Sequence, residues 1–420
     1  MLRPGTVRGP GAVSRCARSR VKGRRPGVAC VRALVRPLLS WFRHHARVLP
    51  WRRTREPYAI WISEIMLQQT RVQTVIPYWH RWMRELPDVQ SLARARLGTV
   101  LKLWEGLGYY TRARNLRQAA RIIVEKHRGR FPERFEDLLA LPGIGRYTAG
   151  AICSIAFHQP TPALDGNGVR VLTRIFGMAG NPREKNTKAE LWNLAQELAH
   201  AAANPRRDGE GNCSLLNQAL MELGAVICAP RRPKCPLCPV RKHCAALREN
   251  RTDQIPNLGK RTASTERRFA AFVVESKGRF LVRQRPPGVI NARLWEFPNV
   301  EVDGRRVEAS QLAEGLLGSR PFAIQPLAEL QHTITRYRIT MEVFRAEFAD
   351  GAVKAPAPNR WCSPAQLQTL AFPSAHRKIL EALRSPSHEQ NFKSGTWKLR
   401  PLGVGDAGRV AAGCSGDTRR

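Results

Sequence analysis

Glu64 lies in the segment WISEIMLQQTRV, whose residue types suit acid–base chemistry. Trp61, Gln68 and Arg71 share with it the spacing i, i+3, i+7 and i+10, which places the four on roughly one face of a helix. A carboxyl group beside Trp and Gln in a cleft would have a raised pKa and act as a general acid. Most helical glutamates are solvated surface residues, and that alternative stays open for Glu64.

Asp165 lies in PALDGNGVRVLTRIF, ahead of a Gly-Asn-Gly turn and an apolar helical pattern. This position is typical of a helix N-cap or an Asx-turn. A capping carboxylate can also stabilise a positively charged sugar. Cleavage of an N-glycosidic bond needs a proton for the leaving base and a carboxylate for the oxocarbenium-like sugar. Glu64 and Asp165 fit that division of roles.

Four cysteines follow in the pattern C-x6-C-x2-C-x5-C, at Cys228, Cys235, Cys238 and Cys244. Iron–sulfur clusters and structural zinc both use four thiolates. Zinc sites usually pair two C-x2-C knuckles, whereas this loop has one, so the spacing favours iron–sulfur over zinc. Basic side chains on the same loop would form a phosphate-facing patch: Arg231, Arg232, Lys234, Arg241 and Lys242.

The segment LPGIGRYTAG, residues 141–150, has a helix–hairpin–helix signature. Gly143 and Gly145 permit a tight turn, and the next helix then presents free N–H groups to an anion such as a DNA phosphate. An ordinary helix–helix turn is the alternative for this motif alone.

The charge of the chain points to a polyanionic partner, which we expect to be DNA. The 420 residues carry a net charge of +37. Residues 1–55 hold fifteen Lys and Arg and no acid, so the rest still carries 37 − 15 = +22. The ten cysteines do not resemble a disulfide framework in a chain of this size, and no apolar run has transmembrane length.

Pattern and composition predict two ordered domains. We expect a disordered basic arm (1–33), a helical domain (34–246), a linker (247–266), a domain rich in strands (267–385) and a disordered tail (386–420). The arm could instead be a mitochondrial transit peptide or the product of an upstream start codon.

Smaller elements can also be placed. One helical stripe is expected along Ile62, Ile65, Met66, Gln69, Val72 and Ile76. Strands are expected in RFAAFVVES, GRFLVRQR, LWEFPNVEV and YRITMEVFRAEF, and short helices at 308–317 and 363–383.

Together these segments resemble adenine DNA glycosylases of the MutY type. The resemblance rests on the ordered motifs LPWR, WISEIMLQQTRV, GLGYYTRARNL, LPGIGRYTAGAI, DGN, NQALMELGAVIC and the cysteine spacing. It implies an all-α helix–hairpin–helix glycosylase fold with a [4Fe-4S] cluster, followed by an α+β Nudix-like domain. The implied activity is monofunctional hydrolysis that releases adenine mispaired with 8-oxoguanine, or with G, in double-stranded DNA.

The resemblance also assigns roles by position. Glu64 matches the acid that protonates adenine, Asp165 the carboxylate that stabilises the sugar cation, and Tyr147 and Asn167 supporting residues. Positions that line the adenine pocket are Arg47, Trp51, Arg52, Leu67 and Glu222. Gln69 and Tyr109 match residues that wedge into the duplex beside the lesion.

This chain departs from the family's sequence pattern at two places. Gly168 stands where the family commonly has Val after DGN, and the turn there could be looser. The loop that reads the lesion usually contains Phe-Ser-His; here residues 332–336 read HTITR, so Thr335 keeps the hydroxyl and Ile334 replaces the aromatic.

Two alternative functions would require different residues. An endonuclease III-type lyase would have Lys at the position of Tyr147, and a non-catalytic DNA-binding relative would not need Glu64 and Asp165. Residues after LWEFPN lack the glutamate-rich Nudix box, so we expect neither pyrophosphatase activity nor catalytic magnesium. We expect a monomer without membrane attachment, in the bacterial cytoplasm, or in the nucleus or mitochondrion of a eukaryote.

Overall fold

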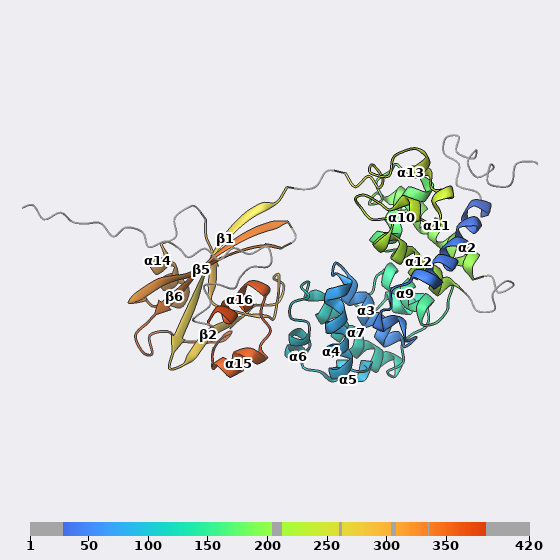
Figure 1. Ribbon diagram of the computed structural model, residues 1–420. Helices are drawn as coiled ribbons and strands as arrows, with labels where there is room; N and C mark the ends of the chain where they lie inside the picture. The colour runs from blue at the N-terminus through green and yellow to red at the C-terminus, as the bar shows by residue number, and fades with distance from the viewer. Residues whose placement is uncertain (1–27, 204–211, 260–262, 304–307, 335, 384–420) are drawn as a thin grey trace, which may run out of the picture. The chain divides into compact units, whose positions relative to one another are not determined.

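The computed structural model describes residues 28–203, 212–259, 263–303, 308–334 and 336–383. The chain divides into two compact units, Met1–Arg261 and Thr262–Arg420. The first unit is helical and the second contains the sheet (Figure 1). Thr335 and the expected tail, 386–420, lie outside the described residues.

The first unit is built from helices and short 3-10 turns. In chain order they are α2 (Val28–His45), η1 (Pro50–Arg52), α3 (Pro57–Leu67), α4 (Val72–Glu85), α5 (Val89–Arg94), α6 (Leu97–Leu103), α7 (Thr111–His127), α8 (Phe135–Leu139), α9 (Arg146–Ile155), α10 (Gly166–Phe176), α11 (Lys185–Ala202), α12 (Cys213–Val226), η2 (Cys235–Leu237), η3 (Arg241–His243) and α13 (Ala245–Arg248). Among the described residues, no helix is long and apolar enough to cross a membrane.

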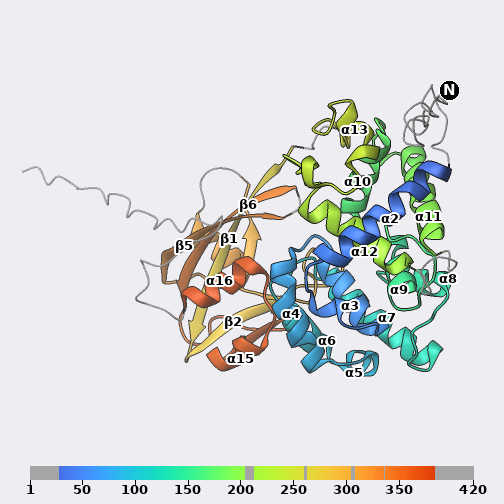
Figure 2. The same cartoon turned by 45° about the vertical axis from the view of Figure 1, so that its right-hand side comes forward.

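The N-terminal helix α2 packs against helices from the C-terminal part of this unit. It packs beside α11 and α12, as Figure 2 shows. Val31, Leu34 and Leu38 are buried in the core shared by these helices and α10. The prediction of a disordered arm over 1–33 was therefore wrong at its end: residues 28–33 belong to α2, and Val31 lies in the core. Residues 1–27 lie outside the described residues.

The stripe expected along residues 62–76 is interrupted. The helix α3 ends at Leu67 and α4 begins at Val72, and Gln69 between them has a left-handed backbone with φ +58°. The prediction failed because α3 is buried on nearly all sides, from Tyr58 to Met66, and so has no single apolar face.

In its described residues, the second unit is a seven-stranded mixed sheet with helices on both faces. Its elements are β1 (Thr265–Ser276), β2 (Arg279–Gln284), β3 (Trp295–Glu296), β4 (Asn299–Glu301), α14 (Ala309–Leu317), β5 (Ala323–Ile334), β6 (Tyr337–Glu347), β7 (Asn359–Cys362), α15 (Pro364–Thr369) and α16 (Ser374–Ala382). The path is β3-β2-β1-β6-β5, with β4 added to β1 and β7 to β2. β1 and β6 are parallel, and the other pairs are antiparallel.

The central strand β1 explains the two cores. Its residues Ala271 and Val273 face α15 and α16, whereas Phe272 and Val274 face α14. A strand buried on both faces is apolar without alternation, as the run AAFVV is. The expected strand LWEFPNVEV is divided into β3 and β4, because Pro298 cannot donate a ladder hydrogen bond.

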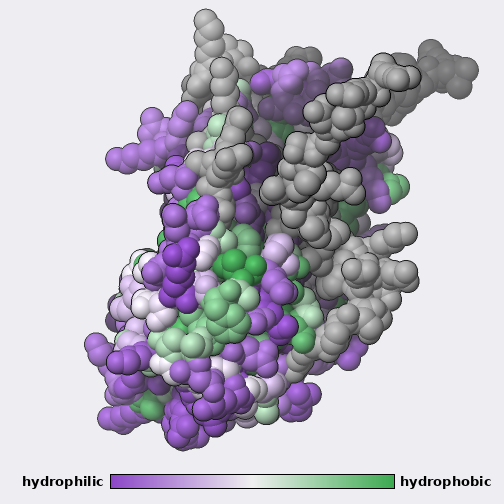
Figure 3. All heavy atoms as spheres, turned by 90° about the vertical axis from the view of Figure 1, so that its left-hand side faces the viewer, coloured by the Kyte–Doolittle hydropathy of each residue, from purple (hydrophilic) through white to green (hydrophobic). Residues whose placement is uncertain are grey.

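The surface of this unit is mixed in character. Figure 3 shows an apolar area within hydrophilic surroundings on the face turned to the viewer. Phe322, just before β5, and Leu327, within its first half, are among the large apolar side chains that remain exposed.

The expected linker is ordered over part of its length. Within 247–266, α13 continues to Arg248, and the buried Ile255 accepts a hydrogen bond from Arg174 Nε at 2.8 Å. β1 begins at Thr265. The polar composition of this segment did not predict the attachment, because it depends on one buried apolar residue, Ile255, and on the backbone carbonyl of that residue.

Candidate active site

A pocket of about 520 Å³ lies in the helical unit, between η1, α3, α9, α10 and α12. It brings together ten of the residues singled out in the sequence: Arg47, Trp51, Arg52, Glu64, Leu67, Gln69, Tyr147, Asp165, Asn167 and Glu222. Segments up to 175 residues apart in the chain therefore meet around one space large enough for a base.

Glu64 is buried in the wall of this pocket, with 6% of its surface exposed. Tyr147 Oη donates a hydrogen bond to Glu64 Oε2. Desolvation by burial raises the pKa of Glu64 to about 7, and the nearby Asp165 adds to the rise, while Tyr147 and Arg52 oppose it. Glu64 can therefore hold a proton at neutral pH and release it to a bound group. The expected helix face is confirmed only in part: Glu64 and Gln68 line the same pocket, but Gln68 follows the end of α3 and Arg71 lies in the next turn.

Tyr147 is the donor that orients Glu64. Burial raises the pKa of Tyr147 well above its usual value, and the charges of Glu64 and Asp165 raise it further. The hydroxyl thus stays protonated. It also lies 3.6 Å from Met221 Sδ, an apolar neighbour that the sequence did not single out.

Asp165 caps α10, as its sequence context predicts. Its Oδ1 accepts a hydrogen bond from Gly168 N at 2.7 Å, and its Oδ2 accepts one from Asn167 Nδ2 at 2.8 Å. Both oxygens are therefore held in place. The turn at Gly168 is a regular start of α10, and a Cβ on Gly168 would lie 3.0 Å from Leu164 Cδ1. A larger residue there would press Leu164 aside.

Glu222 differs from Glu64 although it faces the same pocket. Arg47 Nε donates to Glu222 Oε1 at 2.6 Å, and Arg52 Nη2 donates to Oε2 at 2.8 Å. Burial alone would raise the pKa of Glu222, but these two guanidinium groups outweigh it and the net shift is downward. Glu222 is thus an ionised acceptor and cannot serve as the acid.

One residue important to the site was missed. Arg170 Nη2 donates to Asn167 Oδ1 at 2.7 Å, and its Nε donates to Cys228 O at 2.8 Å. It therefore ties the Asp165 turn to the cysteine loop. The motif VRVLTR contained a signal, since Arg170 and Arg174 are four residues apart on one helix face.

The hairpin glycines have different reasons to be glycine. Gly143 has φ +78°, and a Cβ there would lie 2.7 Å from Asn115 Cβ. Gly145 has φ −97° and is the N-cap of α9; a Cβ there would meet open space. Only Gly143 is required by backbone geometry, while Gly145 leaves room for an anion at the helix N-terminus.

The four cysteines line one small cavity together with Arg174. Arg174 Nη1 lies 3.3 Å from Cys228 Sγ, and this guanidinium is 2% exposed. Among the described residues no three His, Cys, Asp or Glu side chains come close enough to hold a single metal ion. Four thiols around a shared cavity with a buried cation fit an anionic cluster, whose iron atoms each need only one thiolate.

Gln69 and Tyr109 are exposed and lie in separate turns. Together with Gly143 they line a second, neighbouring pocket of about 230 Å³.

Comparison with known proteins places this geometry in a family. Residues 62–197 match the HhH-GPD superfamily of base excision DNA repair proteins, and residues 270–382 match the NUDIX domain. The adenine DNA glycosylase of Mus musculus is 36% identical over 88% of this chain and 81% of its own length. The Homo sapiens enzyme of that name is 36% identical over 84% of this chain and 74% of its own length.

Among solved structures, a thermostable thymine-DNA glycosylase is 30% identical, with a TM-score of 0.47 over 53% of this chain and 98% of its own. The expected order of folds, an all-α helix–hairpin–helix domain before an α+β Nudix-like domain, is confirmed. The chain belongs to the MutY-type adenine DNA glycosylases, a family of base excision repair enzymes.

Proposed function

We propose that this enzyme hydrolyses the N-glycosidic bond of adenine paired with 8-oxoguanine, or with G, in double-stranded DNA. The observation that carries the proposal is the pairing in one pocket of Glu64, with a pKa of about 7, and Asp165, whose carboxylate is held by two donors. Adenine must leave the base stack to reach a buried acid, as in other enzymes that act on bases.

Glu64 supplies the proton. When an adenine ring enters the pocket, the carboxyl group of Glu64 donates to a ring nitrogen, which makes the base a better leaving group. Tyr147 keeps the carboxyl oriented through its hydroxyl. Because burial raises the pKa of Glu64 to about 7, a large fraction of the molecules carry this proton at neutral pH.

Asp165 acts on the sugar. As the bond breaks, positive charge develops on the deoxyribose, and a carboxylate fixed beside it stabilises that charge. The hydrogen bonds from Gly168 and Asn167 hold Asp165 before the reaction begins, so little reorganisation is needed. Water then adds to the sugar and leaves an abasic site.

Glu222 supports selection of adenine. Since Arg47 and Arg52 keep it ionised, it is an acceptor that suits the exocyclic amino group of adenine. Guanine presents a carbonyl oxygen at the corresponding edge, which a carboxylate repels.

The reaction needs no covalent amine intermediate. In the part of the chain that the structure describes, the pocket lining includes no lysine, and Tyr147 stands where the lyase reading would require one. Borohydride trapping on an A:8-oxoguanine duplex should therefore give little cross-linked product. Efficient trapping would contradict the proposal that the enzyme is a glycosylase without lyase activity.

The cysteine loop would hold a [4Fe-4S] cluster through Cys228, Cys235, Cys238 and Cys244. When bound, the cluster fixes the loop whose Cys228 carbonyl accepts from Arg170. Anaerobically purified protein should contain about four irons per chain. Stoichiometric zinc without iron would refute this cofactor.

The decisive experiment measures release of adenine under single-turnover conditions at fixed salt. Duplexes carrying A opposite 8-oxoguanine, G or T are compared, with T as the normal pair. Release from the first two but not from A:T supports the proposal, and equal release from all three overturns it.

Two changed proteins then test whether the second domain recognises the lesion: a chain ending near residue 260, and Thr335→Val. The ratio of release rates on A:8-oxoguanine and A:G duplexes is measured for each. Full 8-oxoguanine preference in the truncated chain would assign selectivity to the helical unit.

A further inference from the structure

The two exposed side chains of the wedge, Gln69 and Tyr109, stand on unusual backbone. Gln69 has φ +58° and lies in the turn between α3 and α4; Tyr109 has φ +47° and lies in the turn between α6 and α7. Non-glycine residues rarely adopt this left-handed conformation and need surrounding contacts to hold them there. Each of the two turns therefore needs contacts that hold its backbone in place.

Arg112, in the first turn of α7, contacts both turns. Toward the first turn, its Nη1 donates to the carbonyl oxygens of Ile65 at 2.8 Å and Gln68 at 2.5 Å. Toward the second turn, its Nη2 donates to the carbonyl oxygens of Leu107 at 3.0 Å and Gly108 at 3.1 Å. One guanidinium thus binds the carbonyl groups that directly precede Gln69 and Tyr109.

Aromatic rings fix the plane of this guanidinium. The Arg112 carbon Cζ lies 5.1 Å from the centre of the Trp104 ring and 5.6 Å from that of Tyr109. Trp104 Nε1 also donates to Gly108 O at 3.0 Å. Desolvation lowers the pKa of Arg112 to about 10, so the group remains charged at neutral pH.

We propose that Arg112 is a positioning residue that sets Gln69 and Tyr109 at a fixed separation, so that both enter the duplex together. The inference rests on the proposed function, in which these two side chains open the stack around the mispair. A planar fork with donors on both sides can span the two turns, whereas a lysine ammonium at the same place reaches one carbonyl group at a time. Arg112 is not assigned any contact with the reacting atoms.

Two substitutions test the proposal in the full chain. Arg112→Lys keeps the charge and the aliphatic stem, and Arg112→Gln removes the charge. The control is Arg121→Gln, on the same helix, where the arginine is exposed and forms an exposed ion pair with Glu125 at 3.7 Å. Thermal melting shows whether each variant is folded.

The main readout is base unstacking rather than activity. A 2-aminopurine placed next to 8-oxoguanine on the lesion strand becomes more fluorescent when the wedge opens the stack. We expect wild type and Arg121→Gln to increase the emission on binding, and both Arg112 variants to lose most of that increase at saturating protein. Single-turnover release of adenine should fall on the order of 100-fold in the Arg112 variants, as for a misplaced positioning group.

The outcomes separate this inference from the proposed function. If wild type does not release adenine from A:8-oxoguanine, the function is wrong, whatever the fluorescence shows. If wild type releases adenine and folded Arg112→Lys unstacks the duplex as well as wild type does, the positioning role is overturned. Arg112→Lys retains the charge and should fold even if Arg112→Gln does not.

Discussion

Two buried glutamates, Glu64 in the helical unit and Glu296 in the sheet unit, have similar burial and opposite chemistry. Their exposed fractions are 6% and 1%. The pKa of Glu64 is raised to about 7, whereas that of Glu296 is lowered below its usual value. The difference lies in their partners rather than in their exposure.

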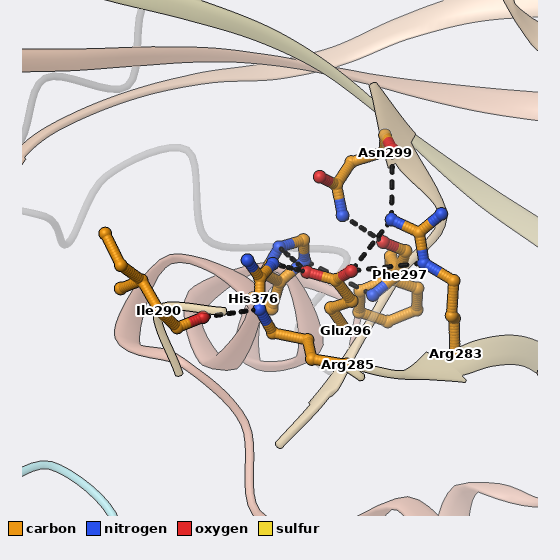
Figure 4. Close-up of polar contacts among 7 residues, drawn as sticks. All are labelled: Arg283, Arg285, Ile290, Glu296, Phe297, Asn299 and His376. Atoms are coloured by element: carbon orange, nitrogen blue, oxygen red, sulfur yellow. Dashed lines mark hydrogen bonds and ion pairs between the residues drawn. The ribbon is translucent and has the colours of Figure 1, made fainter. Parts of the chain in front are cut away.

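Glu296 lies beside two arginines and a histidine, as Figure 4 shows. Arg283 Nη2 donates to Glu296 Oε1 at 2.8 Å, Arg285 Nη1 pairs with Oε2, and His376 Nε2 lies 3.7 Å from Oε2. Burial lowers the pKa of His376 to about 4, so the two arginines supply the positive charge at neutral pH. Burial would raise the pKa of Glu296, but these neighbours outweigh it.

The same arginines anchor backbone around the carboxylate. Arg283 Nη2 donates to Asn299 O at 3.1 Å, and Arg285 Nε donates to Ile290 O at 2.9 Å. The network therefore connects β2, β3, the start of β4 and the loop that contains Ile290. Glu64 instead has one neutral donor, Tyr147, and an acidic neighbour, Asp165. A buried carboxylate paired directly with two arginines is a structural anion, whereas Glu64, which has Arg52 nearby but no direct ion pair, keeps its proton and is an acid.

Glu64→Gln should have the largest effect. Because the amide has no proton to transfer at this step, adenine release should fall by about 10²–10⁴-fold. Single-turnover rates on an A:8-oxoguanine duplex measure the loss, and duplex binding should be kept. A rate within a few-fold of wild type would remove Glu64 from the mechanism.

Glu296→Gln should damage stability instead of chemistry. It leaves Arg283 and Arg285 facing each other without a counter-charge, which typically costs about 3–5 kcal/mol. Urea unfolding of the full chain, followed by a probe in the second unit, measures the change. The matched control is Glu301→Gln, which breaks an exposed pair with Arg267 and should cost about 1 kcal/mol or less. Equal losses in the two variants would contradict the comparison.

The two glutamates should also respond oppositely to pH. The folded protein holds the Glu64 proton up to about pH 7, whereas the unfolded chain loses it near 4.5, so this group's contribution to stability falls as pH rises through that window. Glu296 has a lowered pKa, so its contribution is present above its unfolded value and is lost as pH falls through the folded one.

Adenine release should follow the protonated fraction of Glu64. Above pH 7 the single-turnover rate should fall about tenfold per pH unit, as expected for one required proton. Because the amide of Glu64→Gln does not titrate, the variant should gain stability relative to wild type as pH rises from 4.5 to 7. The gain should approach the order of 3 kcal/mol. A flat rate profile from pH 6 to 9 would exclude Glu64 as the acid.

The sequence predicted the types of residue at the site better than their surroundings. Asp165 was predicted as an N-cap because capping depends on local order along the chain. The state of Glu222 was not predictable, since Arg47 lies 175 residues away. The helix face assigned to Glu64 failed for a related reason: burial of α3 on nearly all sides comes from tertiary packing, which local periodicity does not record.

Tyr147→Phe should have the smallest effect and the most specific signature. The hydroxyl of Tyr147 stabilises the ionised form of Glu64, so its hydrogen bond lowers the pKa of that carboxyl group. Phenylalanine keeps the ring but removes the donor, and the pKa of Glu64 should rise above 7. At pH 6, where Glu64 is already protonated, the rate should fall only a few-fold, since a single hydrogen bond contributes about 1 kcal/mol. At pH 8 to 9 the variant should retain a larger protonated fraction than wild type, so the ratio of variant to wild-type rate should increase with pH. The measurement is the single-turnover rate of both proteins from pH 6 to 9. A ratio that stays constant across this range would mean that Tyr147 supports the pocket without tuning the acid.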